Sequence, residues 1–164
     1  MIQIKTTFLL ISLLLMTACG YHLRGNIELP KGLKAIYLQN GSGELRRSFK
    51  KTLKFIDGKL VNTRDEAGLV VQVIKERMDS RVLSLSNTGR INEEELIYTL
   101  HIMMFDKEGK PLKDKQEIEI RRDFFNDQGD VLGKNNENET IRVEMYDQAV
   151  LTIAQRARAV LEDK

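Results

Sequence analysis

Hydrophobic residues recur at helical spacing in two parts of the chain. The first part lies between positions 44 and 56, where apolar residues follow one another at intervals of four, four and three: Leu45, Phe49, Leu53 and Ile56. These intervals place them on one stripe of a helix. Ser42 or Gly43 stands where this helix would begin, and Asp57 with Gly58 where it would end. We therefore predict a helix with one side facing a core.

A second and longer helix is predicted near the C-terminal end. Its apolar positions step around one face: Ile141, Met145, Ala149, Val150, Ile153, Ala154, Ala157, Val160 and Leu161. Asn136 and Glu139 have the three-residue spacing of a capping box. This spacing predicts that the helix begins near Asn136.

Strand patterns occupy the sequence before and between these helices. Two of them alternate hydrophobic and polar residues with a period of two, and a third is a nearly continuous β-branched run, as in a central strand. Turn residues at 40–43, 87–90 and 106–111 separate them. Leu60 and Val61 could add a further short strand. The predicted strands cover 33–39, 69–74 with an irregular continuation to 85, 96–104 and 116–124.

The order of these elements, β-α-β-β-β-α, predicts an α+β fold. We expect a mixed, mainly antiparallel four-stranded sheet with two helices packed on one face, because each element has a single apolar side to bury. Four residues are expected to pack the last helix against the sheet: Phe124, Phe125, Met145 and Tyr146.

The first residues have the pattern of an export signal. The apolar run Phe8–Met16 is nine residues long, which is too short for a membrane-spanning helix of about 20 residues but fits the centre of a secretory signal peptide. Small residues precede Cys19, the only cysteine in the chain. This arrangement resembles a bacterial lipobox, in which the cysteine is acylated and becomes the new N-terminus.

We therefore predict a cleaved signal peptide at 1–18 and one domain at 19–164, attached to a membrane by acyl groups on Cys19. Two or more acyl chains give stable anchoring. Gly20, in a position where Asp tends to retain lipoproteins in the inner membrane, favours the outer membrane. An ordinary signal peptide with an incidental cysteine is the alternative.

The sequence offers little material for catalysis. The only histidines are His22 and His101, and neither lies in a motif with Ser or Asp that would predict a triad. One cysteine excludes an internal disulfide and a cysteine-based zinc site. Glu93 and Glu95 share one side of a strand and could form a carboxylate pair, although a solvated strand end is the simpler interpretation. We predict no catalytic residue, no metal ligand and no cofactor.

Two segments are similar to a known family. The segment Cys19–Gly25 has the sequence CGYHLRG, and it looks like the start of the lipopolysaccharide-assembly lipoproteins of the LptE family. The segment from Arg122 to Ala149 is similar to the family's aromatic strand end, lysine loop and final helix. The resemblance covers the chain from Cys19 onward and is most specific near its two ends.

The resemblance implies a function without chemistry. Family members are lipid-anchored in the outer membrane, plug the large β-barrel protein LptD and help it to assemble. They also bind lipopolysaccharide and aid its insertion into the outer leaflet. The implied partners are therefore the LptD barrel, lipopolysaccharide and the membrane that holds the N-terminal lipid. A plug in a water-filled barrel agrees with a chain in which 30% of residues are charged.

The family contacts lipopolysaccharide through basic residues on two loops. Lys134, in the predicted loop before the last helix, matches one of them. In the turn between the first two long strands, Asn87 occupies the family's arginine position and Arg90 lies three residues further on. The resemblance thus implies Lys134 and Arg90 as lipopolysaccharide-binding residues, Arg90 on condition that the turn brings its guanidinium to the same place.

Charge is distributed unevenly although the net charge of the chain is only +2. Residues 31–64 hold nine basic and two acidic residues, a balance of +7, whereas residues 93–147 hold eight basic and fifteen acidic residues, a balance of −7. The basic face of the first helix is either a solvated surface or a seat for anionic lipid, lipopolysaccharide or an acidic protein. Export excludes nucleic acid as a partner. The basic residues of this helix are Arg46, Arg47, Lys50, Lys51 and Lys54.

Two further functions are compatible with the residues. A stand-alone periplasmic lipid carrier would hold an acyl chain in a dry cavity between the helices and the sheet. A lipid-anchored hydrolase would need a polar cleft with convergent carboxylates.

Overall fold

Residues 30–125 and 131–162 are described by a computed structural model, with the backbone alone given for Lys31 and for 131–137. The predicted signal peptide and Cys19 lie outside these residues. The described elements are the 3₁₀-helix η1 (Lys31–Lys34), β1 (Ala35–Gln39), α2 (Gly43–Phe55), β2 (Lys59–Val61), β3 (Leu69–Leu85), β4 (Ile91–Asp106), β5 (Pro111–Phe125) and α3 (Val131–Glu162).

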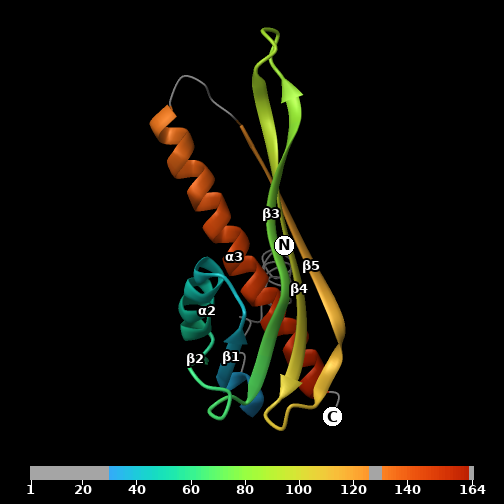
Figure 1. Ribbon diagram of the computed structural model, residues 1–164. Coiled ribbons are helices and arrows are strands. Elements are labelled where there is room, and N and C mark those ends of the chain that lie inside the picture. Colours follow the sequence, from blue (N-terminus) through green and yellow to red (C-terminus); the bar gives the residue numbers. More distant parts are fainter. Residues whose placement is uncertain (1–29, 126–130, 163–164) are drawn as a thin grey trace, which may run out of the picture.

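The described strands form one mixed sheet with the order β2-β1-β3-β4-β5 (Figure 1). The β1 strand pairs in parallel with β2 and with β3, and α2 connects β1 to β2. The β3, β4 and β5 strands are antiparallel. The predicted α+β class is therefore confirmed, and Leu60 with Val61 does form part of a strand, so the described sheet has five strands where four were expected.

The first strand is shorter than its hydrophobic pattern predicts. Residues 31–34 form the turn of η1, in which the Leu33 backbone N–H donates to the Pro30 carbonyl at 2.8 Å. Pro30 supplies a φ of −49°, close to the value that begins such a turn. Leu33 is fully buried all the same, which explains why the sequence pattern extends beyond the strand.

Both helices pack on one face of the sheet, as predicted. The α2 residues Leu45, Phe49 and Leu53 and the α3 residues Met145, Ala149 and Ile153 are buried in one cluster with the strands. The β4 side chains that alternate toward this cluster are buried as their period of two predicts: Leu96, Tyr98, Leu100, Ile102 and Met104.

The α3 helix and its contacts differ from the sequence interpretation at two points. It begins at Val131, five residues before the predicted capping box at Asn136, because no proline interrupts this stretch and the helix continues through it. Phe124 and Met145 are buried and Tyr146 packs against the core, as expected. Phe125 is 64% exposed, because successive side chains of a strand point to opposite faces.

The two phenylalanines of α2 provide a matched pair for testing this packing. Phe49 is fully buried, whereas Phe55 is 81% exposed. We expect Phe49→Ala to lower the free energy of unfolding by about 3–5 kcal/mol, because it leaves a cavity in the core. Phe55→Ala should change it by no more than about 0.5 kcal/mol. Urea unfolding followed by circular dichroism measures both, and equal effects would contradict the packing described.

Candidate functional site

The β3–β4 hairpin extends beyond the rest of the sheet. The last residue of β5, Phe125, pairs with Glu93 of β4, so no described strand accompanies β4 beyond that point. The β1 strand reaches only the first residues of β3. The end of the hairpin, as far as the pair Leu85–Ile91, is therefore a two-stranded ribbon, and it projects at one end of the molecule (Figure 1).

Backbone and hydroxyl groups close the turn of this hairpin. The Ser86 backbone N–H donates to the Arg90 carbonyl at 2.7 Å, and the Gly89 N–H donates to the Ser86 carbonyl at 2.9 Å. The Arg90 N–H in turn donates to the Ser86 hydroxyl at 3.2 Å. Gly89 has a φ of +77°, which glycine adopts without steric cost. The turn thus fixes the backbone of Arg90 while its side chain is exposed.

Large hydrophobic side chains are exposed next to this turn. We call them the apolar tip, and they are 42–64% exposed: Val82, Leu83, Leu85 and Phe125. The pairing of Val82 with Glu94 and of Glu94 with Phe124 places the two strand ends side by side. Val82 lies on the face of the buried Phe124, and Phe125 lies on the opposite face, so the apolar tip exposes hydrophobic groups on both faces of the sheet at one end of the molecule. Exposed apolar groups at one end of a molecule make it a candidate binding surface.

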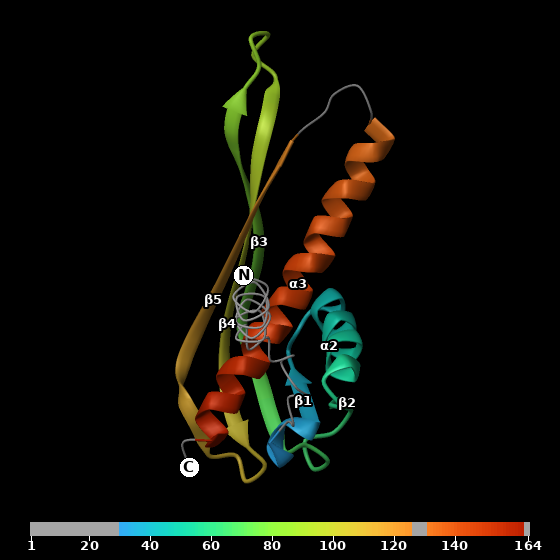
Figure 2. The same cartoon turned by 180° about the vertical axis from the view of Figure 1, so that it is seen from behind.

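The two residues that the resemblance assigns to lipopolysaccharide lie at this end of the molecule. Arg90 is in the hairpin turn, and Lys134 is in the first turn of α3. Lys134 is therefore not in a loop before the helix, which corrects the sequence interpretation. Both views of the ribbon show the hairpin turn and the start of α3 at the same end (Figures 1 and 2).

Below the apolar tip, one carboxylate joins the start of α2 to the sheet. Glu76 of β3 accepts hydrogen bonds from the Ser42 backbone N–H at 2.9 Å and from the Ser42 hydroxyl at 2.6 Å. Ser42 caps α2, as predicted, because its hydroxyl also accepts from the Leu45 N–H at 3.1 Å. The charge of Glu76 therefore lies at the N-terminus of α2, where the helix dipole favours it.

Two tyrosines complete this arrangement. The Tyr98 hydroxyl of β4 donates to Glu76 at 2.9 Å, and its ring meets that of Tyr146 edge to face, with the centroids 4.8 Å apart. Burial, together with the Glu76 charge, raises the pKa of Tyr98 far above its ordinary value of 10.0. Burial also raises the pKa of Tyr146. Both hydroxyls are therefore neutral near pH 7, and that of Tyr98 is a hydrogen-bond donor.

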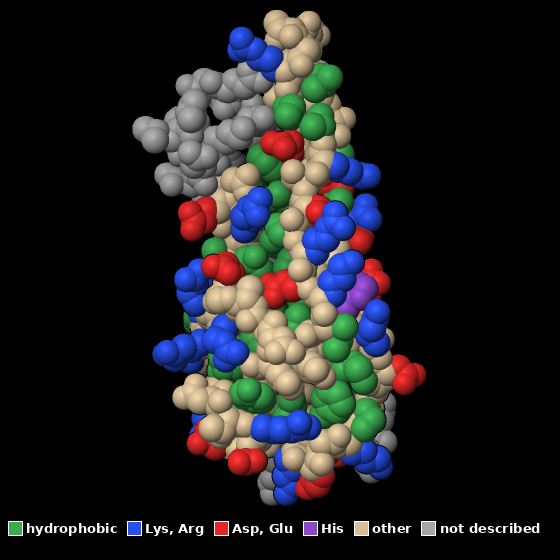
Figure 3. Space-filling view, in the orientation of Figure 1, with side chains coloured by type: hydrophobic (Ala, Val, Ile, Leu, Met, Phe, Trp, Pro, Cys, Tyr) green, Lys and Arg blue, Asp and Glu red, His purple; other side chains and the backbone are tan. Residues whose placement is uncertain are grey.

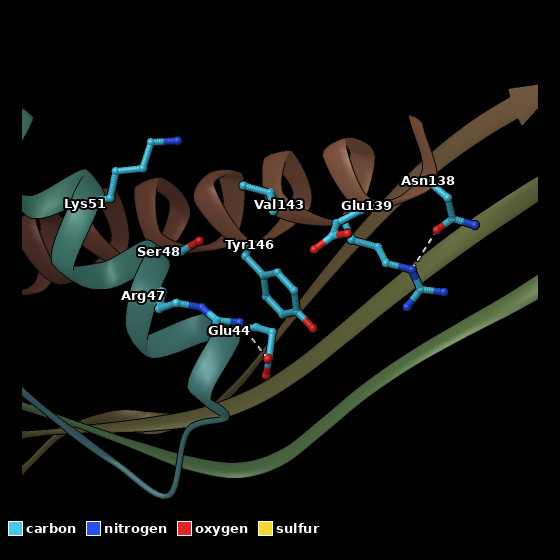
Figure 4. A pocket seen from close by; sticks show the side chains of 9 residues that line it. Glu44, Arg47, Ser48, Lys51, Asn138, Glu139, Val143 and Tyr146 are labelled. Atoms are coloured by element: carbon cyan, nitrogen blue, oxygen red, sulfur yellow. Dashed lines mark hydrogen bonds and ion pairs between the residues drawn. The ribbon is translucent and has the colours of Figure 1, made fainter. Parts of the chain in front are cut away.

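An open pocket of about 750 Å³ lies between α2 and α3. Figure 4 shows Tyr146 directed from α3 toward the first turns of α2, where Arg47 and Glu44 form an ion pair of 2.8 Å. Arg142 donates to the Asn138 side chain at 2.7 Å, and Lys51 pairs with Asp147 beside the pocket at 2.8 Å. The charges of its walls are thus largely balanced within the protein, and the pocket is open and carries charged side chains, unlike the dry cavity that a lipid carrier would need.

The carboxylates considered for catalysis have structural partners. Glu93 accepts a hydrogen bond from the Ser84 hydroxyl at 2.6 Å. Glu95 is only 7% exposed, so the interpretation as a solvated strand end is wrong for it, and it forms ion pairs with Arg81 at 2.7 Å and with Arg121 at 3.9 Å. The described residues contain no cluster of His, Cys, Asp and Glu able to hold a metal. No described helix combines the length and apolarity needed to cross a bilayer.

Comparison with known proteins identifies the family. The LptE family model, described as lipopolysaccharide-assembly, matches residues 33–157, which is more than half of the chain. The chain belongs to the LptE family. The family's members are non-enzymatic, in agreement with the prediction that this chain is not an enzyme.

Relatives of this LptE-family chain match over most of their length. It is 25% identical over 162 residues to the LPS-assembly lipoprotein LptE of Photorhabdus laumondii, covering 96% of this chain and 87% of that protein. It is 27% identical over 161 residues to the LptE of Pectobacterium atrosepticum, covering 94% and 84%.

Solved structures of lipoproteins share the fold of this LptE-family chain. The solution structure of lipoprotein B from Nitrosomonas europaea superposes with a TM-score of 0.65 at 27% identity, covering 85% of this chain and 91% of that one. The crystal structure of rare lipoprotein B from Shewanella oneidensis gives a TM-score of 0.63 at 27% identity, covering 79% and 97%.

Sequence reasoning missed the apolar tip and the Glu76 contacts of this LptE-family chain. Residues 82–85 were interpreted only as a strand continuation. The signal present in the sequence is the segment Val82-Leu83-Ser84-Leu85, which contains no charged residue and lies next to a polar turn. For Glu76 there is no comparable signal, because its partners Ser42 and Tyr98 are 34 and 22 residues away in sequence.

The tyrosine contact predicts how stability depends on pH. The folded state holds Tyr98 protonated, whereas the unfolded chain releases this proton near pH 10. The stability that the protonated Tyr98 hydroxyl contributes is therefore fully present below about pH 10 and is lost as pH rises above it. We expect Tyr98→Phe to reduce this alkaline loss, and to cost about 1.5–3 kcal/mol at pH 7 because a hydrogen bond to a charged group is removed.

Urea unfolding of the wild-type protein and of the Tyr98→Phe variant between pH 7 and pH 11 measures these effects. Tyr37→Phe is the control, because the Tyr37 side chain is on the other face of the sheet in a separate cluster. An unchanged alkaline loss in Tyr98→Phe would contradict the role given to this hydroxyl.

Proposed function

We propose that this protein is an outer-membrane lipoprotein that binds lipopolysaccharide at its hairpin end and occupies the LptD barrel as a plug. Its acyl groups on Cys19 would attach it to the membrane. The observation that carries the lipopolysaccharide part is the apolar tip, which lies beside Arg90 and at the same end as the first turn of α3.

Lipopolysaccharide has the chemistry that such a surface accepts. It carries acyl chains next to phosphate groups, so its binding needs exposed apolar groups close to cations. The apolar tip offers the first, and Arg90 in the adjoining turn offers the second. The family resemblance adds Lys134, whose backbone lies in the first turn of α3. A charged hydrogen bond to a phosphate contributes about 1.5–3 kcal/mol.

The plug role is supported by the surface of the described sheet. The side of β3, β4 and β5 that faces away from the helices carries ion pairs in place of an apolar face, as in Arg77–Asp79 at 2.6 Å and Arg121–Glu119 at 2.7 Å. Charged groups suit the polar lumen of a large barrel. The alternative of a stand-alone lipid carrier requires a dry cavity, and the pocket between α2 and α3 has charged walls.

Affinity purification tests the plug role directly. The tagged full chain, expressed in its own host, is purified from detergent-solubilised outer membrane. We expect a large β-barrel protein to accompany it in a ratio near one to one, because each barrel holds one plug. The measurement is quantitative mass spectrometry of the eluate. Recovery of the chain alone, together with bound lipid, would favour the carrier instead.

Two alanine variants test the lipopolysaccharide contacts. We expect Lys134→Ala and Arg90→Ala each to weaken lipopolysaccharide binding by about 1.5–3 kcal/mol, since each removes a charged hydrogen bond to phosphate. Isothermal titration with purified lipopolysaccharide measures the affinity, and urea unfolding verifies that folding is intact. Lys113→Ala, on the exposed edge of β5, is the control. Equal affinities for all three variants and the wild type would exclude the proposed contacts.

A further inference from the structure

The outward side of α2 carries a row of basic residues that ends in an aromatic one. Spacings of three and four residues place them on one helix face, and they line a shallow hollow of about 490 Å³. Figure 3 shows Lys and Arg side chains gathered on the side of the molecule where α2 lies. We call this set the α2 outer stripe: Arg47, Lys50, Lys51, Lys54 and Phe55.

Two of the four basic side chains in the α2 outer stripe form no ion pair among the described residues. Arg47 and Lys51 form ion pairs with acidic residues of α2 and α3. Lys50 and Lys54 are exposed, and within the described residues they make no hydrogen bond or ion pair. The stripe therefore presents two uncompensated positive charges about one helical turn apart.

Phe55 has no packing role that would explain an aromatic side chain. It is the last residue of α2 and is 81% exposed, the highest value among the described large hydrophobic residues. The end of the helix is made by backbone groups, since the N–H groups of Ile56 and Gly58 donate to the Leu53 carbonyl at 3.1 and 2.8 Å. Phe55 is therefore the one apolar group that the α2 outer stripe offers to a ligand.

We propose that the α2 outer stripe docks on the surface of an anionic phospholipid bilayer. Lys50 and Lys54 lie against the headgroup phosphates, and Phe55 inserts at the boundary between headgroups and acyl chains. Lysines beside an exposed aromatic side chain are features of helices that bind a membrane interface, and because the apolar face of α2 is buried in the core, the contact is limited to the stripe. Each lysine near an anionic membrane surface contributes favourably to binding.

The form of the surface favours a bilayer over a protein partner. The hollow is shallow, and its cations are mainly lysines, whose long flexible stems do not impose a fixed geometry on a ligand. Such a surface suits a fluid layer of headgroups that adapts to it.

The chain contains no tryptophan, so Phe55→Trp gives a single fluorescent reporter within the stripe. The full chain with this substitution is reconstituted with vesicles of phosphatidylethanolamine and phosphatidylglycerol, or with neutral phosphatidylcholine vesicles. In the anionic vesicles we expect a blue-shifted emission that lipids brominated in the acyl chain quench. In neutral vesicles the emission should stay at the wavelength of an exposed indole.

Charge variants in the same background give the quantitative test. Lys50→Gln combined with Lys54→Gln should weaken docking by about thirtyfold, since each lysine near the surface is worth about 1 kcal/mol. Lys113→Gln combined with Lys115→Gln, on exposed positions of β5, removes the same charge elsewhere and should leave docking unchanged. All chains have the same N-terminal segment, so any anchoring by that segment is common to them.

Three results would overturn the proposal. They are equal emission in anionic and neutral vesicles, equal docking of the two double variants, or a blue shift that requires addition of the barrel protein, which would make the stripe a protein interface. Arg90→Ala, which tests the lipopolysaccharide contact, should leave the emission of Trp at position 55 unchanged. The docking proposal and the proposed lipopolysaccharide function therefore fail independently.

Discussion

The carboxylate of Glu76 is the charged group that fixes the start of α2 to the inward side of the sheet. Along the inward side of β3, Leu69, Val71 and Val73 are buried beneath the helices. After the bulge that follows Val73, the next inward group is Glu76, which binds the cap of α2 through Ser42. A partly buried charge is tolerated only where hydrogen bonds compensate for lost water, and here Ser42 and Tyr98 supply them.

The molecule has two parts with different tasks. In the first, both helices and the strands share a continuous core that fixes the shape and extends past Glu76 as far as Leu96 and Phe124. In the second, next to the hairpin turn, Val82, Leu83 and Leu85 are exposed. The surface that we propose for lipopolysaccharide therefore lies outside the part of the chain that stability requires. Substitution at the apolar tip leaves the core untouched for the same reason.

Sequence reasoning was most successful where one periodic pattern determines burial. The alternation from Leu96 to Met104 and the stripe Leu45–Phe49–Leu53 gave the correct faces, because each depends only on local geometry. Applied consistently, the same alternation would have placed Phe124 and Phe125 on opposite faces.

Other features depend on contacts that no local pattern contains. The start of α3 at Val131 was missed because a capping-box spacing at Asn136 does not exclude an earlier beginning. The placement of Glu76 depends on the register of β3 against β4, which pairs it with Leu100. Phe55 could have been found from the sequence, since it lies four positions after Lys51 and thus on the basic side of α2.

The ribbon beyond the pair of Phe125 and Glu93 has a mechanical consequence. A two-stranded hairpin without a third strand or a covering helix is only marginally stable by itself. Its hydrogen bonds can therefore open at a lower free energy than those of the core, without global unfolding. The end of the hairpin can therefore change its backbone conformation more easily than the core. It could adjust to a bulky amphiphilic ligand while the rest of the sheet keeps its position.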